Sequence, residues 1–199
     1  MRKGERTKSV ILNHAVAVAS QFGLEGLSIG SLAGRLEMSK SGLFAHFGSK
    51  EDLQIAVVHQ ARQILSDHVF ASAMREAPGL PRLRAIVQNW MTWTRKADLP
   101  GGCPITAAAY EYDDRPGALR DLLSQTLREL RKTLVRSVRI AVEEGHLRAG
   151  TQPGQLAFEI LGLYLASQLE ARLLGDPEAG PRGLASFEKL IERHRAARS

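Results

Sequence analysis

The sequence predicts an all-α fold of nine helices. Across most of the chain, apolar residues recur three and four positions apart, which is the spacing that gives a helix one apolar face. Clusters of glycine and proline divide these stretches, and no segment alternates apolar and polar residues as a half-buried strand does. The 199 residues are enough to bury a substantial core, in one domain or in two small ones.

The N-terminal quarter predicts one helix of ordinary length followed by two very short ones. The first helix spans about 7–22. Ser28 and Ser39 are placed to cap the two short helices, because a serine hydroxyl accepts hydrogen bonds from the unpaired amides of a first helical turn. Apolar residues repeat on the inner faces of these helices: Ile29, Leu32, Ala33 and Leu36 on the first, and Leu43 and Phe47 on the second.

Gly48 ends the second short helix, and six further helices are expected after it. Ser49 is placed to cap a long helix over about 50–74, and Pro81 is placed to start the next, which ends near Ala97. The other four follow loops: a short helix from about 104 to 112, a long one from about 115 capped by Asp114, one over about 153–174, and a last one after a linker at 175–183.

The two short helices predict a helix-turn-helix at about 28–47. Helices this short are marginal alone, so they must pack against each other. The outer face of the second helix carries small or hydrogen-bonding residues: Lys40, Ser41, Gly42, Ala45 and His46. Such residues let a helix enter the major groove, and a helix N-terminus also attracts phosphate. The spacing alone leaves a solvent-exposed connector helix as the alternative.

A longer pattern runs through residues 7–54. It consists of Phe22-Gly23, Ser28-Ile29, Leu32-Ala33, Met38-Ser39-Lys40, Leu43-Phe44, Phe47, Ser49-Lys50 and Leu53. This pattern resembles the DNA-binding domain of the TetR family of bacterial transcriptional repressors. The chain departs from the family at Glu37, where a glycine is usual in the turn, and at Phe44, where a tyrosine hydroxyl usually meets a phosphate.

The resemblance implies a DNA-binding domain over 1–50 and a larger ligand-binding and dimerisation domain over 51–199. The residues expected to contact DNA are Ser28, Ser39, Lys40, Ser41, Gly42, Phe44, His46 and Lys50. We expect Lys40, Ser41 and Gly42 to lie nearest the bases. Ser28, His46 and Lys50 would contact phosphates, and Phe44 would pack against the sugars. Arg2, Lys3 and Arg6 are expected to add a flexible basic arm.

The helix at about 153–174 is apolar around nearly its whole circumference, so it must be buried on more than one side. One interpretation is a central helix in a monomer. The resemblance implies the other, in which the last two helices of each subunit form a four-helix dimer interface. The residues expected there are Leu161, Leu165, Leu169, Phe187 and Ile191. A two-fold dimer would bind a palindromic operator in double-stranded DNA.

Both tryptophans and two of the three tyrosines fall between residues 90 and 112. Aromatic side chains with a few polar neighbours are typical of ligand pockets, and the resemblance places a small-molecule cavity among these helices. The candidate lining is Trp90, Trp93, Thr94, Cys103, Thr106 and Tyr110. The alternative is that the aromatic residues simply fill the core. The sequence does not identify the effector.

Cys103 is the single cysteine, which excludes an internal disulfide and fits a reducing cytosol. It precedes Pro104, which could begin a helix, and a helix N-terminus raises the reactivity of a thiol. A thiol-based sensor of electrophiles or oxidants with this same fold is therefore one alternative function. A small buried apolar group is the simpler interpretation of the residue.

The sequence favours a regulator over an enzyme. Its six histidines lack the spacing of metal ligands, and it has no nucleophile elbow, phosphate-binding loop or dinucleotide fingerprint, so no cofactor and no metal are expected. The net charge of +6 suits a polyanionic partner. With no signal peptide and no membrane span apparent, we expect a cytoplasmic protein. An all-helical module that docks another protein and does not bind DNA is the remaining alternative.

Overall fold

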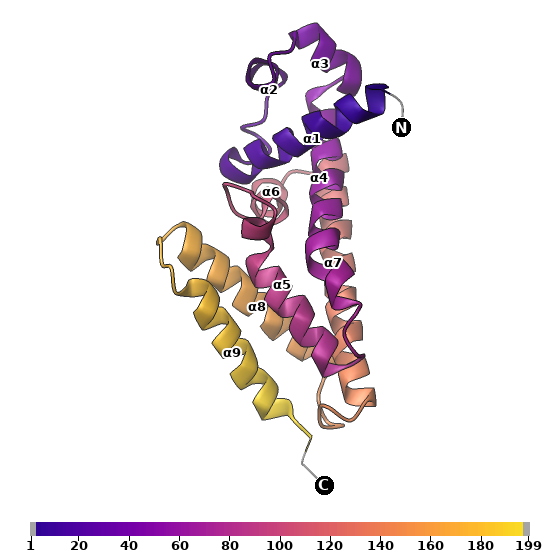
Figure 1. The fold of residues 1–199 in the computed structure, drawn as a ribbon, viewed down its shortest axis with the longest axis vertical. Coiled ribbons are helices and arrows are strands. Elements are labelled where there is room, and N and C mark those ends of the chain that lie inside the picture. Colours follow the sequence, from indigo (N-terminus) through magenta and orange to yellow (C-terminus); the bar gives the residue numbers. More distant parts are fainter. Residues whose placement is uncertain (1–2, 197–199) are drawn as a thin grey trace. The chain divides into compact units, whose positions relative to one another are not determined.

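The computed structural model describes residues 3–196, with the side chains of residues 7–196. This part of the chain contains nine α-helices and no strand, which confirms the predicted all-α fold (Figure 1). The helices are α1 (Lys3–Phe22), α2 (Ile29–Arg35), α3 (Lys40–Phe47), α4 (Lys50–Leu65), α5 (Leu80–Lys96), α6 (Pro104–Tyr112), α7 (Ala118–Glu143), α8 (Pro153–Arg172) and α9 (Ala179–His194). A π-helical segment, Ser66–Ala71, continues α4.

Several helix boundaries differ from the predicted ones. Helix α7 begins at Ala118, and Asp114 does not cap it, because Pro116 and Gly117 intervene and Gly117 has a φ of +144°. Helix α9 begins inside the predicted linker, where Pro181 is tolerated in the first turn because its missing N–H has no partner to lose there. Lys3 and Arg6 belong to α1 and not to a flexible arm, and Arg2 lies outside the described residues.

The chain forms two compact units. Unit 1 comprises Met1–Ile64 and Ala97–Thr126, and unit 2 comprises Leu65–Lys96 and Leu127–Ser199. Helix α6 is therefore part of the same unit as α1, α2 and α3, although it lies beyond the predicted domain boundary at residue 50. Residues 97–126, from the middle of the sequence, therefore lie in the unit that contains the helix-turn-helix.

In unit 1, the buried faces of the short helices meet a core provided largely by α1 and α4. Its fully buried members include Ile11, Leu24, Leu27, Leu32, Leu43 and Leu53. The loop before α6 packs closely on α1: the Gly101 amide donates to Ser20 Oγ at 3.0 Å, and a Cβ on Gly101 would overlap the Ser20 backbone. Glycine is required at this position because two backbones touch.

Unit 2 is built around aromatic side chains from α5 and α8. The rings of Trp90 and Tyr164 stack with centroids 4.1 Å apart, and Trp93 Nε1 donates to Tyr164 Oη at 3.1 Å. Helix α9 packs on the same core through Phe187 and Ile191, both fully buried. These three helices therefore share one apolar interior.

The turn between α2 and α3 holds Glu37 at a φ of +52°, in the left-handed region that favours glycine. This is the position at which the sequence departs from the glycine usual in similar proteins. The backbone conformation is retained although the residue carries a side chain. The turn therefore holds a small amount of backbone strain.

Replacing Glu37 by glycine should stabilise the protein. The left-handed conformation costs about 1–2 kcal/mol for a residue with a Cβ, and glycine loses about 0.5–1 kcal/mol in chain entropy. A net gain of about 0.5–1 kcal/mol in the free energy of unfolding is expected from urea titration. Asp98→Gly is the matched control, because Asp98 has a φ of +50° but aspartate tolerates this region better. A Glu37→Gly protein less stable than wild type would contradict the assignment of strain.

Candidate DNA-binding site

The helix-turn-helix is fixed locally by two serine caps. Ser28 Oγ accepts from the Ser31 amide at 3.0 Å at the start of α2, and Ser39 Oγ accepts from the Gly42 amide at 3.0 Å at the start of α3. Both caps were expected from the sequence, and each satisfies an amide that has no partner within its helix. The inner faces of the two helices, with Leu32 and Leu43, are buried.

The outer face of α3 presents most of the residues expected to contact DNA. Ser39, Lys40, Ser41 and Phe44 are exposed, Gly42 and His46 are half-buried, and Ser28 is exposed at the start of α2. Phe44 is 52% exposed, which is unusual for phenylalanine and leaves it available to a partner surface.

An open hollow of about 510 Å³ lies between α2 and α3. It is lined by Ile29, Gly30, Lys40, Ser41, Phe44 and Ala45. The walls are thus largely apolar, and a lysine amine and a serine hydroxyl provide the polar groups. This combination matches a nucleic acid backbone, in which apolar sugars alternate with anionic phosphates.

Lys50 has a different environment from the other expected contacts. Its Nζ donates to the Glu25 carbonyl at 3.1 Å and to Glu25 Oε2 at 3.0 Å. The ammonium group is thus paired within the protein. Lys50 therefore differs from the other predicted DNA contacts in belonging to a second polar cluster, centred on Glu25.

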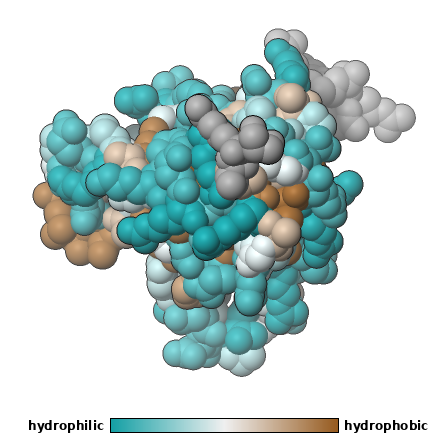
Figure 2. All heavy atoms as spheres, turned by 90° about the horizontal axis from the view of Figure 1, so that it is seen from below, coloured by the Kyte–Doolittle hydropathy of each residue, from teal (hydrophilic) through white to brown (hydrophobic). Residues whose placement is uncertain are grey.

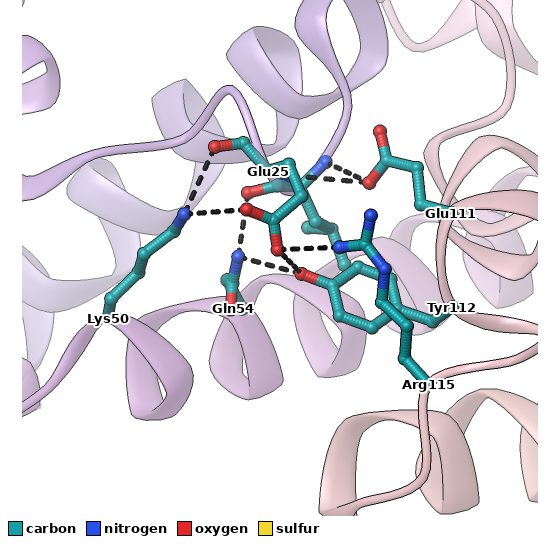
Figure 3. A network of polar contacts seen from close by, with 7 residues as sticks. Glu25, Lys50, Gln54, Glu111, Tyr112 and Arg115 are labelled. Atoms are coloured by element: carbon teal, nitrogen blue, oxygen red, sulfur yellow. Dashed lines mark hydrogen bonds and ion pairs between the residues drawn. The ribbon is translucent and has the colours of Figure 1, made fainter.

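This second cluster joins α6 and α4 to the turn between α1 and α2 (Figure 3). Tyr112 Oη donates to Glu25 Oε1 at 2.6 Å, and Arg115 pairs with the same oxygen at 3.2 Å. Gln54 Nε2 donates to Tyr112 Oη at 3.1 Å and to the Leu24 carbonyl at 2.8 Å. Glu111 Oε2 accepts from the amides of Leu24 and Glu25 at 2.9 and 3.3 Å.

The contacts in this cluster shift the pKa values of Glu25 and Tyr112 in opposite directions. Hydrogen bonds from Tyr112 and then from Lys50 lower the pKa of the Glu25 carboxyl below its ordinary value. Burial, followed by the bond to Glu25, raises the pKa of Tyr112. Glu25 therefore remains an anion and Tyr112 remains a neutral donor, the combination that gives a charge-assisted hydrogen bond.

The candidate pocket residues are divided between the two units. Trp90 and Trp93 are 2% and 0% exposed in the core of unit 2, and Thr94 is half-buried on the same helix. In unit 1, Cys103 Sγ caps α6 by accepting from the Thr106 amide at 3.4 Å, and the thiol is buried. Tyr110 is 67% exposed. Both tryptophan side chains therefore pack in the core of unit 2.

The candidate dimer residues separate into two groups. Phe187 and Ile191 are fully buried inside the subunit, so their assignment to a dimer surface is wrong: they lie on the inner face of α9. Leu161 and Leu165 are half-buried, and Leu169 is 56% exposed. Phe158 on the same helix and Leu173, its C-cap residue, are also exposed, and the predicted interface did not include them. Figure 2 shows a mainly hydrophilic face on which hydrophobic residues gather at the left edge and again right of the centre.

Within residues 3–196, no helix is long and apolar enough to cross a bilayer. Among the side chains of residues 7–196, no three histidine, cysteine, aspartate or glutamate groups lie together as metal ligands do.

Comparison with known proteins agrees with this geometry. A family model described as "Bacterial regulatory proteins, tetR family" matches residues 11–57, and one described as "Tetracyclin repressor-like, C-terminal domain" matches residues 79–187. An uncharacterized HTH-type transcriptional regulator, YezE of Bacillus subtilis, is 23% identical over 148 residues, covering 73% of this chain and 75% of the relative.

Solved structures share the fold. A TetR transcriptional regulator from Chloroflexus aurantiacus superposes with a TM-score of 0.89 at 24% identity, over 99% of this chain and 100% of that one. AibR, solved with isovaleryl coenzyme A and operator DNA, has a TM-score of 0.73 at 21% identity, over 92% of this chain and 96% of its own. With the C-terminal model matching more than half of its length, the chain belongs to the TetR family of bacterial transcriptional regulators, which bind DNA and are not enzymes.

Proposed function

We propose that the protein is a homodimeric repressor that binds a palindromic operator and is released from it by a small molecule. The observation that carries the proposal is the outer face of α3, where Lys40 and Ser41 border an open hollow on a rigidly capped helix. AibR, which shares the fold, was solved with operator DNA and an acyl coenzyme A, so the fold accommodates both kinds of ligand.

The proposed contacts follow from the size and exposure of the side chains on α3. The major groove admits a helix whose outer face is small, and Ser41 and Gly42 provide such a face beside Lys40. Phe44 would pack against sugars in the hollow, and His46 and Ser28 would contact phosphates. Lys50, which also pairs with Glu25, would contact a phosphate as well.

The proposed dimer uses the outer face of α8. Phe158, Leu161, Leu165, Leu169 and Leu173 follow one another at helical spacing, and Leu173 is 75% exposed. A continuous apolar stripe of this kind typically marks an interaction surface. A second copy of the same helix would cover it symmetrically, and the dimer would place two copies of α3 on two operator half-sites.

The proposed effector acts by binding more tightly to the DNA-free protein than to the DNA-bound protein. A small molecule releases the operator only if it binds more tightly to the protein when DNA is absent. The candidate contacts form two separate sets. Trp90, Trp93 and Thr94 lie on α5 in unit 2, and Cys103, Thr106 and Tyr110 lie at α6 in unit 1. The burial of Cys103 and its role as the cap of α6 argue against the thiol-sensor alternative. We place the repressor in the cytoplasm, with the chromosomal DNA it binds.

Lys40→Ala should weaken binding to DNA taken from beside the gene. Loss of one base or phosphate contact costs about 1–3 kcal/mol, which corresponds to about tenfold or more in affinity. Fluorescence anisotropy over a range of salt concentrations measures this loss. Lys189→Ala is the matched control, because it removes an equally exposed charge from α9. Equal losses for the two variants would mean that only net charge matters, and no binding at any salt would favour the protein-docking alternative.

Leu169→Glu should convert the dimer to a monomer without unfolding the subunit. Leu169 is 56% exposed within one chain, so the charge is tolerated until a second copy covers it. Sedimentation velocity at micromolar protein gives the assembly state, and circular dichroism gives the helix content. Met74→Glu is the control, because Met74 is 48% exposed but lies off α8. A Leu169→Glu protein that remains dimeric would exclude this stripe as the interface.

A further inference from the structure

We propose that Glu111 and Tyr112, at the end of α6, are positioning residues that hold the turn between α1 and α2. Together they fix the position at which α2 begins. This inference rests on the proposed operator binding and adds two positioning residues to it. All the residues involved belong to unit 1.

The first anchor is a carboxylate seated in the turn. Gly23 has a φ of +72°, and the next two amides, those of Leu24 and Glu25, both donate to Glu111 Oε2. Successive amides that point to one centre form an anion-binding concavity. A Cβ on Gly23 would overlap the Glu111 carboxylate, so the glycine is required by both its conformation and its neighbour.

The second anchor is the Tyr112 hydroxyl. Tyr112 and Gln54 are 8% and 4% exposed, and the hydroxyl donates to Glu25 while it accepts from Gln54 (Figure 3). Glu25 is thus bound by α6 through Tyr112 and by α4 through Lys50. Charge-assisted bonds in a partly buried network are strong and favour one fixed arrangement.

The turn that contains Leu24 and Glu25 directly precedes the helix-turn-helix. Only Gly26 and Leu27 separate Glu25 from Ser28, the cap of α2, and Leu27 is fully buried. A displacement of Glu25 must therefore shift the start of α2 or break its cap. Because α2 has seven residues, it has little capacity to absorb the shift internally.

Helix α6 also carries candidate effector contacts. Cys103 caps its first turn, and Thr106 and Tyr110 lie along it, whereas Glu111 and Tyr112 are its last two residues. A molecule bound to these residues would therefore lie on the same nine-residue helix as both anchors.

The test measures operator affinity of full-length variants at one salt concentration. Glu111→Ala leaves two amides without their acceptor and should weaken binding about tenfold, as expected for loss of bonds to a charged group. Glu111→Gln should recover most of this loss, because its amide oxygen accepts the same two bonds. Asp114→Ala, which removes a nearby exposed carboxylate, should change affinity less than twofold.

A double-mutant cycle tests whether Tyr112 acts through Glu25. Tyr112→Phe should weaken operator binding about tenfold alone, but less than twofold in a Glu25→Gln background. Wild-type affinity in Glu111→Ala and Tyr112→Phe, or fully additive losses in the cycle, would overturn the inference. In either of those cases the wild type still binds, which separates this failure from failure of the proposed function.

A measurement without DNA tests the same link independently. Amide hydrogen exchange at Ser31, the amide bonded to the α2 cap, should become about tenfold faster in Glu111→Ala, whereas exchange in α5 should not change. Unchanged exchange at Ser31 would overturn the inference even if the protein bound no operator.

Discussion

The helix-turn-helix follows a turn in which the Glu111 carboxylate accepts hydrogen bonds from the amides of Leu24 and Glu25, and we take this contact as the constraint on where α2 begins. Helices α2 and α3 have seven and eight residues, too few to be stable in isolation. Their geometry comes from serine caps, from a shared apolar core and from the turn that precedes them. Glu111 fixes that turn from α6, so the helix-turn-helix includes a part supplied from later in the chain.

Interactions between close neighbours in the chain could be predicted from the sequence. The caps at Ser28 and Ser39 and the buried faces of α2 and α3 depend on residues three or four positions apart, so each leaves a local pattern. The cap expected at Asp114 failed for a local reason, because Pro116 and Gly117 delay the start of α7. Phe44 and Glu37 were both singled out, and both have unusual environments.

Interactions between distant residues could not be predicted in this way. Glu111 bonds to amides 86 and 87 positions earlier, and neither partner carries a local signal of the other. The sequence also did not predict which apolar residues of α8 and α9 are exposed on the subunit surface. Leu169 and Phe187 both lie in apolar stripes, yet one is 56% exposed and the other is fully buried. Periodicity identifies an apolar face, but it does not say whether that face meets the core or a second subunit.

The central claim, that α6 holds the turn before the DNA-contacting helices, is tested most directly by amide exchange in the unmodified protein. Exchange at Leu24 and Glu25 can be compared with exchange in the middle of α1. The account predicts that both amides exchange as slowly as hydrogen-bonded helical amides, because each donates to Glu111. Exchange at both positions as fast as in an unstructured chain would contradict it.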